Sequence, residues 1–96
     1  MSDEAPVTVR DDRDAGRFEA VDDSGVVAGF AAYRRSPDRI VFTHTVVDDA
    51  FEGRGVGSTL VRGALDALRG EGLRVVPQCP FVKSFIERHP EYADLT

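Results

Sequence analysis

The sequence predicts an α+β fold in which an antiparallel meander of strands is extended by one parallel strand and carries two main helices. Three observations support this prediction. Short polar turns separate the apolar runs of the first half, which is typical of antiparallel strands. Apolar residues of the second half then recur at helical spacing. A further apolar run, 73–77, follows that helix, so strand, helix and strand form a βαβ unit with parallel strands and a right-handed crossover.

The first half of the chain is predicted to consist of strands joined by turns. Residues 7–10 form a short candidate strand, and the segment before it, 1–6, is expected to be a disordered tail. Stronger candidates follow, with alternating or β-compatible apolar residues, at 17–21, 26–34 and 40–47. The turn Asp22-Asp-Ser-Gly25 places Gly25 where a positive φ is needed.

The first helix is predicted to follow the glycine-rich stretch 52–59. Its apolar residues share one face: Val56, Leu60, Val61, Ala64, Leu65 and Leu68. Gly70 or Gly72 ends this helix. Gly63 inside it costs up to ~1 kcal/mol relative to alanine, so its presence indicates close packing against another element.

A strand at 73–77 and a second helix complete the predicted fold. Pro80 suits the first turn of this helix, and Pro90 stops it. The predicted apolar stripe of the helix consists of Phe81, Val82, Phe85 and Ile86.

Length, charge and cysteine content limit the classes of function. The 96 residues predict a single domain, 1–96, and the net charge of −5 argues against general nucleic-acid binding, which relies on Lys and Arg. No apolar run approaches the ~20 residues of a membrane helix, and the acidic N-terminus does not resemble a signal peptide. We therefore expect a cytoplasmic protein with no membrane or nucleic-acid partner. A lone cysteine and two distant histidines predict no internal disulfide and no metal site.

The glycine loop is the most informative motif. It reads EGRGVGST over 52–59 and connects the end of a predicted strand to the start of a helix. Free backbone N–H groups at a helix N-terminus attract phosphate, and glycine lets the ligand approach the backbone. The P-loop pattern does not fit because no lysine lies near the loop, and the dinucleotide fingerprint does not fit because Ser58 stands where its third glycine belongs. A tight turn without a ligand is the alternative.

Residues 47–61 resemble the acyl-CoA-binding segment of the GNAT superfamily of N-acetyltransferases, in which Arg/Gln-x-x-Gly-x-Gly/Ala opens an amphipathic helix. A subfamily of very short GNAT-like proteins is similar in three further stretches: His44-Thr45, Pro77-Gln-Cys-Pro-Phe81 and His89-Pro-Glu-Tyr92. The resemblance covers about Phe18 to Leu95. It implies a GNAT-like fold, acetyl-CoA or CoA as cofactor, and transfer of the acetyl group to an amine that the sequence does not identify.

The resemblance also implies where the cofactor binds. The pantetheine arm would lie between the ends of two parallel strands, 43–47 and 76–79, and hydrogen-bond the backbone near Val46 and Val47. Residues of the glycine loop would bind the pyrophosphate: Gly53, Arg54, Gly55, Val56, Gly57, Ser58 and Thr59. Basic residues are candidates for the 3′-phosphate, with solvated helix faces as the alternative: Arg62, Lys83 and Arg88.

Two residues are candidates for the chemistry at the thioester. His44 is expected to share a strand face with Phe42 and Val46, where its imidazole could deprotonate an amine. The alternative for His44 is a half-buried residue that is hydrogen-bonded across the sheet. Cys79 falls near the N-cap of the last helix, where the dipole favours a thiolate. Three roles are open for Cys79: it forms a transient acyl-cysteine, it positions the thioester, or it packs as a small apolar residue.

Two departures from the family pattern favour a second interpretation. Glu52 stands where the motif has Arg or Gln, so backbone donors of 53–58 would carry more of the pyrophosphate contact. Ile86 stands where larger relatives place a tyrosine acid, and the N-terminal helices that help to form their acceptor site are missing. The alternative function is therefore a non-catalytic acyl-CoA-binding or sensing module that acts through a protein partner.

Overall fold

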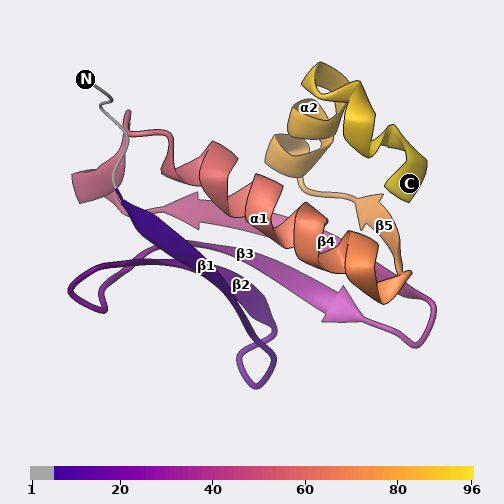
Figure 1. Ribbon diagram of the computed structural model, residues 1–96, viewed down its shortest axis with the longest axis horizontal. Coiled ribbons are helices and arrows are strands. Elements are labelled where there is room, and N and C mark those ends of the chain that lie inside the picture. Colours follow the sequence, from indigo (N-terminus) through magenta and orange to yellow (C-terminus); the bar gives the residue numbers. More distant parts are fainter. Residues whose placement is uncertain (1–5) are drawn as a thin grey trace.

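The computed structural model describes residues 6–96, which form one five-stranded sheet with the order β1-β2-β3-β4-β5 (Figure 1). The strands are β1 (Val7–Asp12), β2 (Arg17–Asp22), β3 (Val27–Arg35), β4 (Arg39–Val47) and β5 (Arg74–Pro77). The helices are α1 (Val56–Glu71) and α2 (Pro80–Arg88), with short 3₁₀ helices η1 (Asp49–Phe51) and η2 (Pro90–Leu95). The predicted tail falls, apart from the exposed Pro6, outside the described residues.

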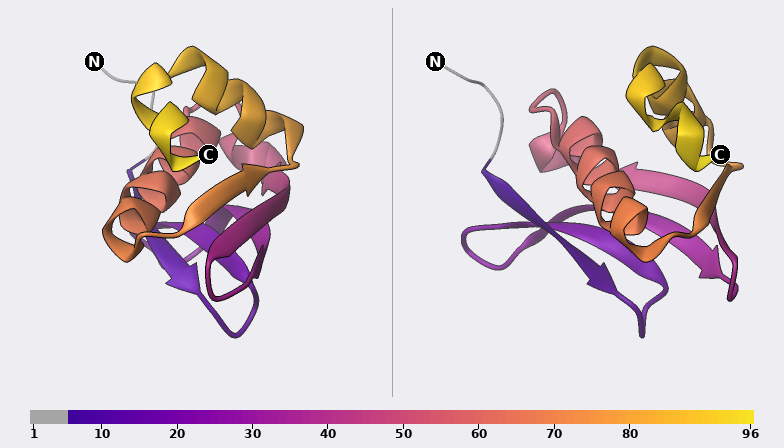
Figure 2. Two further views of the ribbon diagram at one scale, coloured as in Figure 1. Left: turned by 90° about the vertical axis from the view of Figure 1, so that its right-hand side faces the viewer. Right: turned by 45° about the vertical axis from the view of Figure 1, so that its right-hand side comes forward.

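The pairing of the strands confirms the predicted topology. Neighbours from β1 to β4 are antiparallel, and β4 pairs with β5 in parallel across the crossover through α1. The turn between β2 and β3 has Gly25 at φ 85°, as the sequence predicts. Both helices cover the same face of the sheet and leave its other face without a helix (Figure 1, Figure 2).

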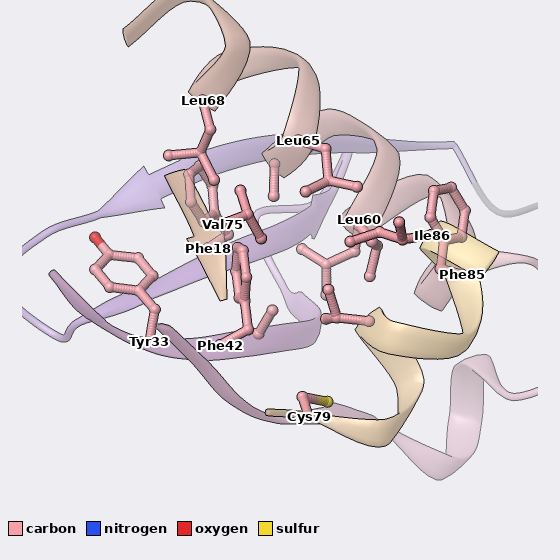
Figure 3. Close-up of a cluster of buried hydrophobic side chains, with 14 of the residues drawn as sticks. Phe18, Tyr33, Phe42, Leu60, Leu65, Leu68, Val75, Cys79, Phe85 and Ile86 are labelled. Carbon is pink, nitrogen blue, oxygen red and sulfur yellow. The ribbon is translucent and has the colours of Figure 1, made fainter. Parts of the chain in front are cut away.

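The core lies between the sheet and the two helices (Figure 3). Its largest fully buried side chains come from β2, β4, α1 and α2, among them Phe18, Phe42, Leu60, Leu65 and Phe85. Burial of each such side chain stabilises the fold by about 1.5–3 kcal/mol. The apolar face of α1 is buried as the helical periodicity predicts.

Glycines set how closely α1 approaches the sheet and where it ends. A Cβ added at Gly63 would lie 2.8 Å from the Cβ of Val9, so α1 crosses β1 at a distance that only glycine allows. This confirms the close packing expected from Gly63. Gly72, with φ 72°, is the C-cap of α1 and ends the helix, whereas Gly70 lies within it.

A β-bulge in β4 changes which residues share a face. Ala32 pairs with His44 and Tyr33 pairs with Phe42, so Thr43 is an extra residue in the ladder. Phe42 is buried in the core, whereas His44 and Val46 are exposed on the face without helices. The prediction that Phe42, His44 and Val46 share one face is therefore wrong, because the bulge reverses the alternation between Phe42 and His44.

Candidate functional site

The glycine loop forms an open N-terminus for α1. Gly53 and Gly55 have φ values of 77° and 74°, a left-handed conformation that other residues adopt at a cost. Gly55 is the N-cap, and no side chain caps the helix. The first helical hydrogen bond runs from the Thr59 N–H to the Gly55 carbonyl oxygen, at 3.0 Å. The amides of residues 56–58 precede this bond and are therefore available to an anion.

The side-chain charges around this loop favour an anion only weakly. Asp49 and Glu52 flank the loop together with Arg54, and all three are exposed. The first turn of α1 contains no acidic residue. Attraction of a phosphate group would therefore come mainly from the backbone amides and the helix dipole.

Gly57 has a packing role beside its predicted binding role. A Cβ at this position would lie 2.7 Å from Cζ of Phe81 in the first turn of α2. Phe81 is 37% exposed, so its placement in the buried stripe of α2 is wrong. Its ring instead covers the start of α1, where the missing Cβ of Gly57 leaves room for it. The remaining members of that stripe are buried: Val82, Phe85 and Ile86.

Strand pairing between β4 and β5 ends before β4 does, and the unpaired stretch between residues 43–47 and the chain that follows β5 is here called the gap. The parallel ladder ends at the pair Phe42 and Pro77, and the Cys79 N–H donates to the Phe42 carbonyl oxygen at 2.9 Å. Beyond Phe42, the edge of β4 that faces β5 has no strand partner among the described residues. Residues 43–47 therefore offer backbone polar groups to an extended ligand, as a sheet edge does.

The bulge also determines which backbone groups face this gap. The Asp48 N–H donates to the Ala28 carbonyl oxygen at 2.8 Å, so Asp48 points toward β3. Because backbone groups alternate along a strand, those of Val46 also point toward β3, and those of Thr45 and Val47 point into the gap. Of the two residues expected to offer their backbone to pantetheine, only Val47 has backbone groups that point into the gap. Those of Thr45 point there as well, although the sequence pattern does not single out this residue.

Cys79 lies at the inner end of the gap. It is the N-cap of α2 and is 2% exposed, so its side chain is part of the core (Figure 3). Its Sγ lies 3.3 Å from Oγ1 of Thr45, and either atom can donate the hydrogen bond. This contact places the thiol against the segment of β4 that has no strand partner on this side.

His44 lies on the other side of β4. Its ring makes an edge contact with Phe30, with ring centres 5.8 Å apart, and its Nδ1 is 3.3 Å from Oγ1 of Thr43. Neighbouring residues of a strand point to opposite faces, so His44 points away from the face on which Thr45 contacts Cys79. The structure therefore does not bring the two candidate catalytic side chains together.

The three basic residues considered for the 3′-phosphate differ in how they are held. Arg62 stacks over Phe85, with Cζ 5.5 Å from the ring centre, and lies 3.8 Å from the Glu91 carboxylate. Arg88 donates to the Ser84 carbonyl oxygen at 3.4 Å. The side chain of Lys83 is exposed. Arg62 thus packs α1 against the C-terminal helices, which is a structural role.

Residues 6–96 contain neither a metal-binding cluster nor a helix suited to cross a membrane. No group of three or more His, Cys, Asp and Glu side chains is arranged to hold a metal ion in this part of the chain. No helix among these residues is long and apolar enough to cross a membrane.

Comparison with known proteins identifies the family. Residues 17–95 match the family of GCN5-related N-acetyl-transferases. Protein NATD1 of Bos taurus is 31% identical over 86 residues, which are 88% of this chain and 76% of that protein. Protein NATD1 of Mus musculus is 29% identical over 86 residues, covering 88% and 78%. An NMR solution structure of a GCN5-like candidate N-acetyltransferase from Staphylococcus aureus matches with a TM-score of 0.69 and 26% identity, covering 92% of this chain and 85% of that one. The chain belongs to the GCN5-related N-acetyltransferase family.

Proposed function

We propose that this protein binds acetyl-CoA and transfers its acetyl group to an amine. One observation carries the proposal beyond family membership. The unpaired edge of β4, residues 43–47, runs toward the open N-terminus of α1, so that an extended ligand with an anionic end can contact both. Acetyl-CoA has this form, because its pantetheine arm ends in a pyrophosphate. The cytoplasmic location expected from the sequence is part of the same proposal.

The loop and the strand edge bind different parts of the molecule in this proposal. The pyrophosphate contacts the amides of residues 53–58, with Arg54, Ser58 and Thr59 as further donors. The pantetheine arm pairs with β4 through the backbone of Thr45 and Val47, next to Val46. Its thioester then lies close to Cys79, whose side chain closes the gap from the core side.

The transfer itself is a direct acyl transfer. The amine nitrogen attacks the thioester carbonyl carbon, and a backbone N–H of β4 stabilises the oxygen of the tetrahedral intermediate. The C–S bond then breaks and CoA leaves as its thiol, while the amine loses a proton. His44 is the base for an amine that arrives from the face without helices. Cys79 acts from the opposite side of β4, as a positioning thiol or as a transient acyl carrier.

A pair of matched glycine variants tests the cofactor site. Acetyl-CoA at a hundredfold excess over its Kd should stabilise the protein by about 2.7 kcal/mol and raise Tm by ~10 °C or more. Gly53→Val should greatly reduce this shift, because the side chain strains a positive φ in the loop. Gly25→Val is the control, because Gly25 also has a positive φ and open space around its Cβ position, but lies in the β2–β3 turn.

The measurement is a thermal melt of each variant with and without acetyl-CoA. Both variants should melt earlier than the wild type, and only Gly53→Val should lose the ligand-dependent shift. An equal shift in Gly53→Val and Gly25→Val would overturn the site, and no shift in the wild type would overturn acetyl-CoA binding.

A second function, acyl-CoA binding without transfer, is favoured by one observation. Ile86 is buried and apolar, and His44 and Cys79 lie on opposite sides of β4, so no proton donor and acceptor are paired across the thioester. Release of free CoA thiol in the presence of a pooled amine panel separates the two functions. A shift in Tm without thiol release would indicate a binding module.

A further inference from the structure

A hollow of about 190 Å³ lies on the sheet face that the helices leave open. Side chains of Arg17, Phe30, Val46 and Asp48 line it, together with residues 27–29 at the start of β3. The hollow touches β4 from the side opposite to Cys79. Its volume is below the ~300–1,000 Å³ of sites for drug-sized ligands, so it suits one small molecule.

Arg17 presents a fixed guanidinium group to this hollow. Its Nε donates to Oε2 of Glu19 at 2.7 Å, and its Cζ lies 4.5 Å from the centre of the Phe30 ring. The two terminal nitrogens of Arg17 have no hydrogen-bond acceptor in the described part of the chain, and the side chain is 32% exposed. A guanidinium held in this way is pre-organised for a carboxylate, which it can bind with both terminal nitrogens.

The other residues of the hollow add a negative charge and an apolar wall. Asp48 accepts the Ala50 N–H with Oδ1 at 2.9 Å, and its Oδ2 has no hydrogen-bond partner among the described residues. Phe30 and Val46 supply apolar surface, and Val46 is 44% exposed. A cation, an anion and an apolar wall in one small hollow complement a zwitterion with an apolar side chain.

We propose that this hollow is the acceptor site and that the acceptor is an α-amino acid with an apolar side chain. This inference rests on the proposed acetyl transfer. The carboxylate of the amino acid binds Arg17, its amino group lies toward Asp48 and Val46, and its side chain packs on Phe30. The amino group is then next to the segment of β4 that holds the thioester in the proposed function.

Every bond and proton of the proposed reaction is accounted for by the amine, the thioester, His44 and water. The ammonium group loses one proton to His44, which contacts Phe30 on the same face, or to water. The nitrogen lone pair forms the new N–C bond to the acetyl carbon, and the C–S bond breaks. CoA departs as a thiolate and takes up a proton, and the second amine proton leaves with the collapse of the intermediate.

Titration with two N-acetylated leucine analogues tests the carboxylate contact without any turnover. N-acetylleucine mimics the acetylated product, and N-acetylleucinamide differs from it only in having a neutral amide in place of the carboxylate. We expect N-acetylleucine to bind at least ~10-fold more tightly, because hydrogen bonds between charged groups are the stronger ones. Backbone amide NMR signals of Gly29, Phe30 and Val46 should move during the titration.

Variants of two arginines separate recognition from stability. Arg17→Gln should remove the preference for the carboxylate. Arg10→Gln should keep it, because Arg10 also binds Glu19, at 2.8 Å, but does not line the hollow. If Arg17→Gln does not fold, Arg17→Lys replaces it, because lysine retains a positive charge next to Glu19. Arg17→Lys should lose most of the preference for the carboxylate, because lysine lacks the planar guanidinium group that binds a carboxylate with two nitrogens.

The outcomes distinguish this inference from the proposed function. Equal binding of the two analogues to the wild type, or an equal loss of preference in the Arg10 and Arg17 variants, overturns the amino-acid site while leaving acetyl-CoA binding untouched. A carboxylate preference in a protein whose Tm does not respond to acetyl-CoA overturns the acceptor role of the hollow together with the proposed function.

Discussion

Glu19 is the only buried charged residue among residues 6–96, and it is buried on the sheet face without helices. Its carboxylate accepts hydrogen bonds from Nε of Arg10 at 2.8 Å and from Nε of Arg17 at 2.7 Å. Burial alone raises the pKa of Glu19, but the hydrogen bonds from the two arginines outweigh it and hold the pKa below its ordinary value of 4.5. The residue therefore keeps its charge and fixes Arg17 at the edge of the hollow.

The lowered pKa of Glu19 predicts a dependence of stability on acid. Because the folded-state pKa lies below the unfolded one, this contribution is present above about pH 4.5 and is lost as the pH falls further. Glu19→Gln should lower the free energy of unfolding near neutral pH and flatten its fall between about pH 5 and pH 2. Urea unfolding across this range measures both effects. Glu87→Gln, on an exposed position of α2, is the control and should leave the slope unchanged.

The thiol of Cys79 allows a second test at the level of one residue. With 2% exposure, Cys79 should react with iodoacetamide much more slowly in the folded protein than in urea. The structure therefore predicts a protected thiol even in the unliganded protein. Saturating acetyl-CoA should slow the labelling further, since the proposed thioester lies against Thr45 and Cys79. An equal labelling rate with and without acetyl-CoA would contradict this placement.

At the scale of elements, the contact between α1 and β1 depends on the missing side chain of Gly63. Gly63→Ala should destabilise the protein by about 1–3 kcal/mol, because the new Cβ would overlap Val9 and force the helix away from the sheet. Gly70→Ala is the matched control in the same helix, because nothing lies within 4 Å of its Cβ position. It should stabilise the protein by up to ~1 kcal/mol through helix propensity. Tm values of the two variants should move in opposite directions.

The sequence predicts most elements because each has a local signal. Polar turns delimit the strands of the meander, and the apolar spacing from Val56 to Leu68 reports the buried face of α1. The bulge at Thr43 has no such signal, since threonine suits a regular strand equally well. The alternation along the sequence therefore places His44 and Val46 on the face of Phe42, whereas the bulge turns them to the other face. The apolar spacing predicts Phe81 in the stripe of α2, whereas its ring packs over the start of α1, where Gly57 has no Cβ, and no sequence pattern reveals this contact.

The candidate site also has some features with a local signal in the sequence and others without one. The N-terminus of α1 could be predicted from its glycines, and Cys79 at the N-cap of α2 from the proline that follows it. The contact of Thr45 with Cys79 and the hollow beside Arg17 depend on which strands are neighbours. They also depend on the bulge at Thr43 and on a register shift between β2 and β3, where Val21 pairs with Val27 and Ala20 with Gly29. Contacts between residues far apart in sequence are determined by how the strands of the sheet pair and pack. They therefore cannot be predicted from the local pattern of one sequence.

At the scale of the whole molecule, two tyrosines tie distant parts of the fold together. The hydroxyl of Tyr33 donates to Asp11 and joins β3 to β1, while the hydroxyl of Tyr92 donates to Oδ1 of Asp66 at 2.7 Å and joins η2 to α1. Both bonds lie away from the glycine loop. Burial, reinforced by the hydrogen-bonded carboxylate in each case, raises the pKa of Tyr33 and of Tyr92 above the ordinary value of 10.0.

These raised pKa values predict that the whole fold loses stability in alkali. A folded-state pKa above the unfolded one gives a contribution that is complete below about pH 10 and is lost as the pH rises through the folded values. The double variant Tyr33→Phe/Tyr92→Phe should lose roughly 1 kcal/mol per removed hydrogen bond near neutral pH. Its free energy of unfolding should then fall less steeply than that of the wild type above about pH 10. Urea unfolding followed by circular dichroism gives both quantities, and tyrosinate absorbance during an alkaline titration of the wild type should rise together with unfolding. The acetyl-CoA shift in Tm should survive in the double variant, because the hydroxyls bond Asp11 and Asp66, which are not among the residues of the proposed site. Parallel alkaline slopes in the variant and the wild type would show that the tyrosine pKa values do not control this transition.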